Sequence, residues 1–239
     1  STEKRFFSWA CEASPESMTS WMGAARGHLE KAQASIPQTA TRIQESLKAL
    51  QLYQKALAVD SAEWMVLRVD REGANSGQGD ALFLAGDFEQ AEMVYKTTLK
   101  GYPESPYARI GYANCLTRRG EIHGQEGERT KAEELWEKAL NYYAKAEELR
   151  RTLIVAVQGQ GMCLAFLGRY EEALPFLERA FQHSPENPEF ARSLAEVHAT
   201  LGRFHFARQT LERHLQVLPQ SPMALDFREA IEGLRKQTP

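Results

Sequence analysis

The chain has 239 residues, of which 43% are hydrophobic and 26% are charged, and 29 Lys and Arg residues stand against 32 Asp and Glu residues. These fractions are those of an ordinary globular protein with a sizeable core, so they exclude a chain that is disordered throughout. A formal charge of -3 gives no basic footprint for nucleic acid or an anionic membrane, and no apolar run approaches the roughly 20 residues that span a bilayer. We therefore predict no nucleic-acid partner and no membrane span.

Beyond residues 1–17, which are predicted to be an N-terminal extension, the apolar residues recur at helical spacing. Alternating apolar and polar runs, which are typical of strands, are absent from the sequence. In residues 18–60, two apolar segments, Trp21–Ala25 and Ala49–Ala56, predict a first pair of helices. The stretch around Ile36–Pro37 is then an insertion between them.

Glycine and proline divide the rest of the chain at regular intervals. Each of Gly86, Gly168 and Gly202 follows an apolar helical stretch and precedes a polar residue and an aromatic one. This order is typical of a tight turn between two helices. Gly168 and Gly202 are 34 residues apart, and so are Pro185 and Pro219. A fixed period of this length predicts stacked helical repeats.

Three segments carry small, bulky and aromatic residues at matching positions of a 34-residue helix–turn–helix unit. This pattern resembles the tetratricopeptide repeat (TPR). The matching residues are Gly79, Leu82, Gly86, Phe88, Ala91, Tyr95 and Pro103 in 72–105; Val157, Gly161, Leu164, Gly168, Tyr170, Ala173, Leu177, Ala180 and Pro185 in 154–187; and Leu194, Ala195, Gly202, Phe204, Ala207, Leu211 and Pro219 in 188–221.

Two further segments complete the predicted array. In residues 106–151, a first helix from Tyr107 to Arg119 is followed by a glycine-containing stretch that ends at Gly127. A second helix then begins near Lys131 and runs on to about Arg151, longer than the usual second helix of the resembled family. Residues 222–236 form an amphipathic helix that suits the capping role of a terminal unit. Its apolar residues are Met223, Leu225, Phe227, Ala230, Ile231 and Leu234.

The resemblance implies an all-α fold, a TPR-like α-solenoid. In that fold, antiparallel helix pairs form a right-handed superhelix, and the first helix of each pair lines a concave groove. We expect a single domain over residues 18–239 with about four to five repeats, insertions and the capping helix.

In the geometry that the resemblance implies, a stripe of exposed side chains on each first helix faces the groove. Spacings of three and four residues place each set on one helix face, and the mixture of aromatic, Met and Arg residues is typical of binding hot spots. Alternatively, Met162 and Phe166 belong to the core, because core residues follow the same spacing. The predicted partner-binding residues are Tyr107, Ile110, Asn114, Arg118, Gln158, Met162, Phe166, Arg192 and Glu196.

We find no residue pattern that points to catalysis, to a cofactor or to a metal ion. The glycine pairs Gly77–Gly79 and Gly159–Gly161 do not complete a GxGxxG motif and follow no strand, so close helix packing explains them better. The six histidines include no HExxH motif, and three scattered cysteines are too few for a disulfide framework. We therefore predict no catalytic residue, no cofactor and no metal ligand.

The predicted function is that of a non-enzymatic scaffold, or adaptor, that binds a peptide or helix of a partner protein in the concave groove. Without a signal sequence in the chain, the cytoplasm is the expected location. Two alternatives stay open. The chain is an accessory TPR region of a larger enzyme, secretion or transporter assembly that positions substrate, or it is a self-associating oligomeric scaffold. The second alternative rests on Trp9, Trp21 and Trp64, which the repeat core does not need.

Overall fold

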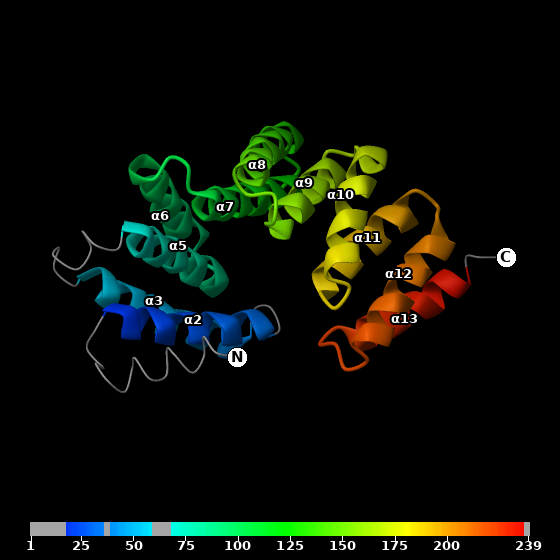
Figure 1. Ribbon diagram of the computed structural model, residues 1–239. Coiled ribbons are helices and arrows are strands. Elements are labelled where there is room, and N and C mark those ends of the chain that lie inside the picture. Colours follow the sequence, from blue (N-terminus) through cyan, green and yellow to red (C-terminus); the bar gives the residue numbers. More distant parts are fainter. Residues whose placement is uncertain (1–17, 36–38, 59–67, 237–239) are drawn as a thin grey trace. The chain divides into compact units, whose positions relative to one another are not determined.

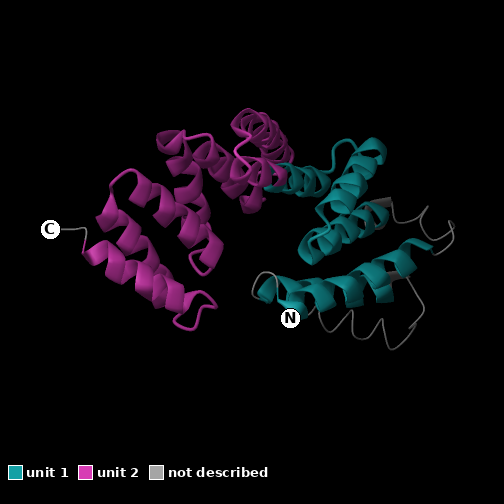
Figure 2. Ribbon diagram, turned by 180° about the vertical axis from the view of Figure 1, so that it is seen from behind, with its two compact units in different colours: residues 1–118 teal, residues 119–239 magenta. Residues whose placement is uncertain are grey.

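The computed structural model describes residues 18–35, 39–58 and 68–236, and every regular element among them is an α-helix, as predicted (Figure 1). The chain divides into two compact units, residues 1–118 and 119–239, and the division falls inside helix α7, Pro106–Gln125 (Figure 2). Within the described part of the chain, no helix combines the length and the apolar character that a bilayer crossing needs. The predicted N-terminal extension, the insertion around Ile36–Pro37, Trp9 and Trp64 lie outside the described residues.

The first unit is built from helices that pack side by side. Helix α2 (Met18–Ala34) packs along α3 (Ala40–Ala58), and α3 packs against α5 (Arg68–Ala85), which pairs with α6 (Phe88–Gly101). Trp21 is partly buried against the core between α2, α3 and α5, so it contributes to the packing of this unit. That core consists of Ala25, Leu29, Ala49, Tyr53, Ala56, Ala74 and Ala81.

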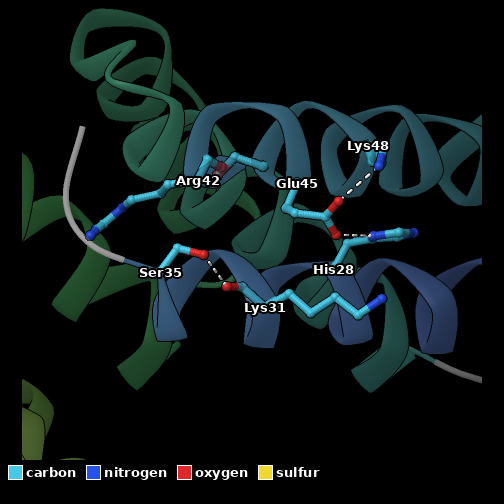
Figure 3. Close-up of polar contacts among 7 residues, drawn as sticks. His28, Lys31, Ser35, Arg42, Glu45 and Lys48 are labelled. Atoms are coloured by element: carbon cyan, nitrogen blue, oxygen red, sulfur yellow. Dashed lines mark hydrogen bonds and ion pairs between the residues drawn. The ribbon is translucent and has the colours of Figure 1, made fainter. Parts of the chain in front are cut away.

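A polar contact joins α2 to α3 (Figure 3). Nδ1 of His28 lies 2.7 Å from Oε2 of Glu45, and Nζ of Lys48 donates to Oε1 of Glu45 at 2.8 Å. The hydrogen bonds from Lys48 and His28 lower the pKa of Glu45 from 4.5 to about 2. At the end of α2, the Ser35 hydroxyl donates to the carbonyl oxygen of Lys31 at 2.8 Å, so a carbonyl of the last turn gains a partner.

The second unit continues the pairing of helices. Helix α8 (Arg129–Leu149) packs against α9 (Ile154–Phe166), which pairs with α10 (Tyr170–His183). Helix α11 (Pro188–Thr200) pairs with α12 (Phe204–Val217), and α13 (Ala224–Arg235) packs on α12. The core formed by α9 to α13 includes the large residues Leu164, Leu174, Leu177, Phe181, Phe190, Leu194, Leu211, Phe227 and Ile231.

Glycine ends the first helix of the pairs α5–α6, α9–α10 and α11–α12, as the sequence predicted. Gly86, Gly168 and Gly202 have φ angles of 92°, 77° and 71°, in the left-handed region that glycine adopts without a steric penalty. Gly127, with φ of 80°, does the same between α7 and α8. The turn of that pair therefore lies at Gly127.

The prediction that α7 ends at Arg119 is wrong, because the helix continues to Gln125. Gly120 lies inside the helix, and a Cβ atom there would meet Nε1 of Trp136 at 2.5 Å, so the indole of α8 occupies the space that glycine leaves. Helix α7 has 20 residues where α9 and α11 have 13, and α8 has 21 where α10 and α12 have 14. Seven residues make about two helical turns, so both partners are lengthened equally and stay paired.

Glycines inside the first helices accept bulky residues from neighbouring helices, as predicted for Gly79 and Gly161. A Cβ atom at Gly79 would lie 2.6 Å from the Tyr95 ring, and one at Gly161 would lie 2.7 Å from Leu177. At Gly159 the distance to the Tyr143 ring would be 2.5 Å. Since real Cβ atoms do not approach so closely, glycine at these positions lets the helices pack tightly.

The last helix covers the end of the second unit. Phe227 and Ile231 are buried, but Leu225 is 66% exposed, so its predicted place on the apolar face is wrong. His214 of α12 is fully buried and lies edge-on to the Phe227 ring, with 5.2 Å between the ring centroids. Its Nδ1 donates to the carbonyl oxygen of Pro185 at 2.8 Å, because a carbonyl only accepts. His214 thus connects α12 to α13 and to the turn that precedes α11.

Candidate functional site on the first helices

The predicted partner-binding residues of the first unit lie on α7. Tyr107 is 47% exposed, and Asn114 and Arg118 are half-buried. Ile110 is only 9% exposed, so in this structure its side chain is not offered to a partner. The reason is that α7 is buried around most of its circumference here, including Ala108, Tyr112, Ala113, Cys115 and Leu116. The accessible stripe of α7 is therefore narrower than its spacing predicted.

Arg118 also forms one wall of a cavity of about 280 Å³ in the first unit. Arg42 of α3 lines the same cavity, together with Phe83 and Phe88 at the turn between α5 and α6. The Arg118 guanidinium lies 5.6 Å from the centroid of the Phe88 ring, within cation–π range. Sequence reasoning missed Arg42 and Phe88, because only the packing of α3 and α6 brings them to Arg118.

The three predicted residues of α9 are all half-buried. Nε2 of Gln158 donates to Oγ of Ser193 at 3.3 Å, so this side chain connects α9 to α11. Phe166 stacks on Trp136 of α8, with 5.2 Å between the ring centroids and 21° between the planes. Met162 packs against the core of the second unit. Phe166 and Met162 therefore combine a packing role with partial exposure.

Arg192 and Glu196 lie one turn apart on α11. A guanidinium nitrogen of Arg192 lies 3.6 Å from a carboxylate oxygen of Glu196, and a second one pairs with Glu189 at 2.5 Å. The loss of water around its carboxyl group raises the pKa of Glu196, and the positive charge of Arg192 acts in the opposite direction. Ion pairing therefore holds both side chains on this face of α11.

Arg192 and Glu196 border an open cavity of about 560 Å³ between α11 and α13. Its floor is apolar and includes Leu211 of α12 and Phe227 of α13, both of which are buried. Asp226 of α13 stands on the opposite side of the opening from α11. Sequence reasoning placed α13 as a cap and missed its part in this cavity. The spacing of Arg192 and Glu196 predicted that they share one stripe of α11, and both line this cavity.

Among the residues that the structure describes, a cluster of metal-binding residue types occurs at the turn between α7 and α8. Nδ1 of His123 lies 2.6 Å from Oε2 of Glu128 and 3.6 Å from Oε2 of Glu126, and one donor atom from each residue lies within 4.8 Å of the others. These three residues could hold a divalent cation. Nζ of Lys131, however, binds the other oxygen of Glu128 at 2.7 Å, and its positive charge would compete with the cation.

Family models of the tetratricopeptide repeat match residues 76–128, 111–186 and 167–231 of the chain. Among solved structures, the chain is similar to a thermophilic TPR protein of Thermus thermophilus, with a TM-score of 0.66, 19% identity, and coverage of 89% of this chain and 100% of that one. It is also similar to YrrB, a TPR protein with an unusual peptide-binding site, with a TM-score of 0.51, 20% identity, and coverage of 93% and 97%. These likenesses confirm the predicted fold class, a TPR-like α-solenoid.

Two curated relatives are longer than this chain. A TPR repeat-containing protein of Methanocaldococcus jannaschii is 24% identical across 82% of the chain, and the match spans 38% of that protein. The aspartyl/asparaginyl beta-hydroxylase of Mus musculus is 24% identical across 58% of the chain, and the match spans 18% of the enzyme. The chain therefore corresponds to well under half of each relative.

Proposed function

Because the chain belongs to the tetratricopeptide repeat family, whose fold serves as a scaffold for protein–protein interaction, we propose that it is a non-enzymatic scaffold that binds a peptide or helix of a partner protein. The bound segment lies on the face of the first helices. The observation that carries this proposal is the cavity of about 560 Å³ between α11 and α13, which two of the predicted residues, Arg192 and Glu196, border.

The chemistry of this face suits a polypeptide ligand. Its cavity falls within the range of about 300–1,000 Å³ that ligand clefts occupy, and its lining is apolar with a few charged groups at the opening. Apolar side chains of a partner would supply affinity by burial, and the charged groups would fix the orientation. The peptide-binding site of YrrB, a protein with the same kind of fold, supports a peptide as ligand.

Affinity capture on the intact chain tests the proposal. The double variant Arg192→Ala and Glu196→Ala removes two accessible side chains from the cavity edge, and Glu229→Ala removes an exposed carboxylate of α13 that does not line the cavity. We expect quantitative mass spectrometry to report at least a tenfold lower recovery of bound protein with the double variant and an unchanged recovery with Glu229→Ala. Equal recovery with all three proteins would contradict the proposal.

A second candidate function is that of an accessory repeat region in a longer protein. The observation that favours it is the match to only 38% and 18% of the two curated relatives, of which the second is an enzyme. In this case the scaffold positions a segment for a catalytic unit outside the described residues. The reading frame around the coding sequence tests it: a frame that continues into a catalytic domain supports this candidate, and a frame limited to these 239 residues opposes it.

A further inference from the structure

Helix α13 stands apart from α11, although α11 begins one repeat and α13 occupies the corresponding position after that repeat. Cα atoms of α9 and α11 come within 8 Å of each other, and the hydrogen bond from Gln158 to Ser193 connects these two helices. In the described chain, α13 approaches α12 to the same limit but not α11. The cavity of about 560 Å³ lies in the space between α11 and α13. We name it the α11–α13 slot.

One sequence difference distinguishes the helix that borders the slot. Positions 159, 193 and 227 are equivalent by the 34-residue period, and they hold Gly159 in α9, Ser193 in α11 and Phe227 in α13. A small residue is needed where a first helix packs tightly on the preceding second helix, since a Cβ atom at Gly159 would already lie 2.5 Å from the Tyr143 ring. Phe227 is instead a full aromatic residue, buried to 3% exposure against His214. Its ring packs against α12 and lines the slot.

The walls of the slot are mostly apolar, and several of the residues that form them are small. Leu211 and Phe227 form the floor, and Met223 and Leu234 are partly buried beside them. The small residues that line the slot are Ala195, which is buried, and Ala199 on α11, and Ala230 and Gly233 on α13. A space with such walls gains free energy when an apolar side chain replaces water, at about 25 cal/mol per Å² of apolar surface buried.

The charge at the opening is negative. Glu196 and Asp226 border the slot from opposite helices. Among the described residues that line the slot, the one guanidinium is that of Arg192, which pairs with Glu189 and Glu196 and also lies in the field of Glu121. Carboxylates therefore outnumber the cation that faces them. A positively charged group at this opening would be attracted, and a negatively charged one repelled.

We infer that the α11–α13 slot binds a bulky apolar side chain, such as Leu, Met or Phe, that is flanked by Lys or Arg in a segment of a partner protein. This inference rests on the proposed function and specifies the ligand of the same surface. The apolar side chain enters between α11 and α13 and contacts Leu211 and Phe227. The flanking cation pairs with Glu196 or Asp226.

Three fluorescein-labelled dodecapeptides in a Gly/Ser background test the inference against the full chain. The basic probe contains Leu-Lys-Arg-Leu, the acidic probe contains Leu-Glu-Glu-Leu, and the third probe, Ala-Lys-Arg-Ala, lacks the apolar anchors. Fluorescence anisotropy at about 0.15 M salt, where the Debye length is about 8 Å, measures affinity while the charges far from the slot are largely screened. We expect the basic probe to bind at least tenfold more tightly than either of the other two.

Variants of the protein locate the bound probe. Ala230→Phe fills the slot and should weaken the basic probe at least tenfold, while Glu196→Lys and Asp226→Lys should each weaken it about fivefold. Glu229→Lys, which makes the same charge change on α13 outside the slot, should stay within twofold of the unchanged protein. Glu196 and Asp226 are exposed, so their variants retain the fold even where Ala230→Phe loses it, and circular dichroism checks each protein.

Equal affinity for the basic and acidic probes, or an affinity that neither Ala230→Phe nor the charge variants change, would overturn the slot assignment. Failure of the slot and failure of the scaffold are distinguishable. A partner that is captured by the intact chain and lost with the Arg192 and Glu196 double variant keeps the proposed function, even if the basic probe does not bind. Loss of the proposed function requires that capture itself does not depend on this face.

Discussion

The hydroxyl group of Tyr95 on α6 donates a hydrogen bond of 2.5 Å to Oδ1 of Asp80 on α5. The Tyr95 ring is 1% exposed and fills the space that Gly79 of α5 leaves. Loss of water raises the pKa of Asp80 from 3.8 to about 6, and the hydrogen bond from Tyr95 acts in the opposite direction. At neutral pH, the ionised carboxylate of Asp80 therefore destabilises the folded state, and the hydrogen bond from Tyr95 offsets part of that destabilisation.

Replacing Asp80 with Asn should remove a pH dependence of stability. Because the folded pKa of about 6 lies above the unfolded value of 3.8, the folded state binds the proton more tightly. The contribution of Asp80 to the free energy of unfolding is thus most favourable below about pH 4, and it is lost as the pH rises through 6. Asp80→Asn keeps an acceptor for Tyr95 without the charge. We expect the free energy of unfolding at pH 7 to rise by up to about 3 kcal/mol.

Urea denaturation of the parent and Asp80→Asn proteins from pH 4 to pH 7.5 measures the difference. Tyr95→Phe serves as a matched variant, since it removes the donor and leaves the carboxyl group. It should move the pKa of Asp80 further up and lower the stability at pH 7. A parent protein whose stability does not fall between pH 4 and pH 7 relative to Asp80→Asn would contradict the prediction.

Substitution of Gly159 by Ala should destabilise the second unit, although alanine favours helix. The new Cβ atom would lie 2.5 Å from the Tyr143 ring, so the ring must move, and overpacking of this kind costs about 1–3 kcal/mol. At Gly27, inside α2, a Cβ atom would meet nothing within 4 Å. Gly27→Ala should therefore gain about 1 kcal/mol from helix propensity alone.

Thermal and urea unfolding of the two glycine variants should change in opposite directions. Tyr143→Leu in the Gly159→Ala background relieves the overlap and should restore part of the lost stability. If Gly159→Ala and Gly27→Ala stabilise the protein equally, the inference that α8 and α9 pack tightly at Gly159 would be contradicted.

The ring stack between Phe166 and Trp136 should contribute measurably to stability. Phe166 is half-buried, so Phe166→Ala should cost roughly 1–3 kcal/mol, less than the 3–5 kcal/mol of a fully buried Phe. A double-mutant cycle with Trp136→Leu should give a coupling of about 0.5–1.5 kcal/mol, typical of aromatic pairs. Tyr107→Ala, at a 47% exposed position, should change the stability by less than about 0.5 kcal/mol. Zero coupling in the cycle would contradict the stack.

Local sequence signals predicted the turns and the close helix packing. Gly86, Gly168 and Gly202 each end a first helix because the left-handed conformation of the turn favours glycine, and that requirement is local. The end of α7 was missed because Gly120 lowers helix propensity by about 1 kcal/mol, and only contact with Trp136 explains its place in a helix. The spacing Ala132, Trp136, Ala139, Tyr143 and Ala146 in α8 repeats the second-helix pattern after seven residues, which could have revealed the longer pair.

The site was predicted less completely than the fold, since a helical stripe defines a face but not its neighbours. Arg192 and Glu196 border a cavity, although their spacing predicted only that they share one helix face. Ile110 is on the same kind of stripe and is buried, because packing around α7 covers it. Phe227 lines the α11–α13 slot at a position that holds Gly159 and Ser193 in the two preceding repeats. Only the packing of α13 shows that this residue lines a cavity.

The contact of Glu45 with His28 and Lys48 should make the first unit sensitive to acid (Figure 3). The pKa of Glu45 is lowered to about 2 by its hydrogen bonds to Lys48 and His28. Because the folded pKa lies below the unfolded value of 4.5, the contribution of Glu45 is complete above about pH 4.5 and is lost as the pH falls towards 2. Glu45→Gln removes the charge, so the stability at pH 7 should fall slightly and the loss between pH 4.5 and 2 should become smaller.

Thermal unfolding followed by circular dichroism over this pH range measures both changes in the Glu45→Gln protein, and Glu104→Gln, at an exposed position, is the control. Raising the salt concentration at pH 7 should narrow the difference between parent and Glu45→Gln, since salt screens the ion pair with Lys48. Identical acid profiles for the parent and Glu45→Gln would show that this contact does not stabilise the packing of α2 on α3.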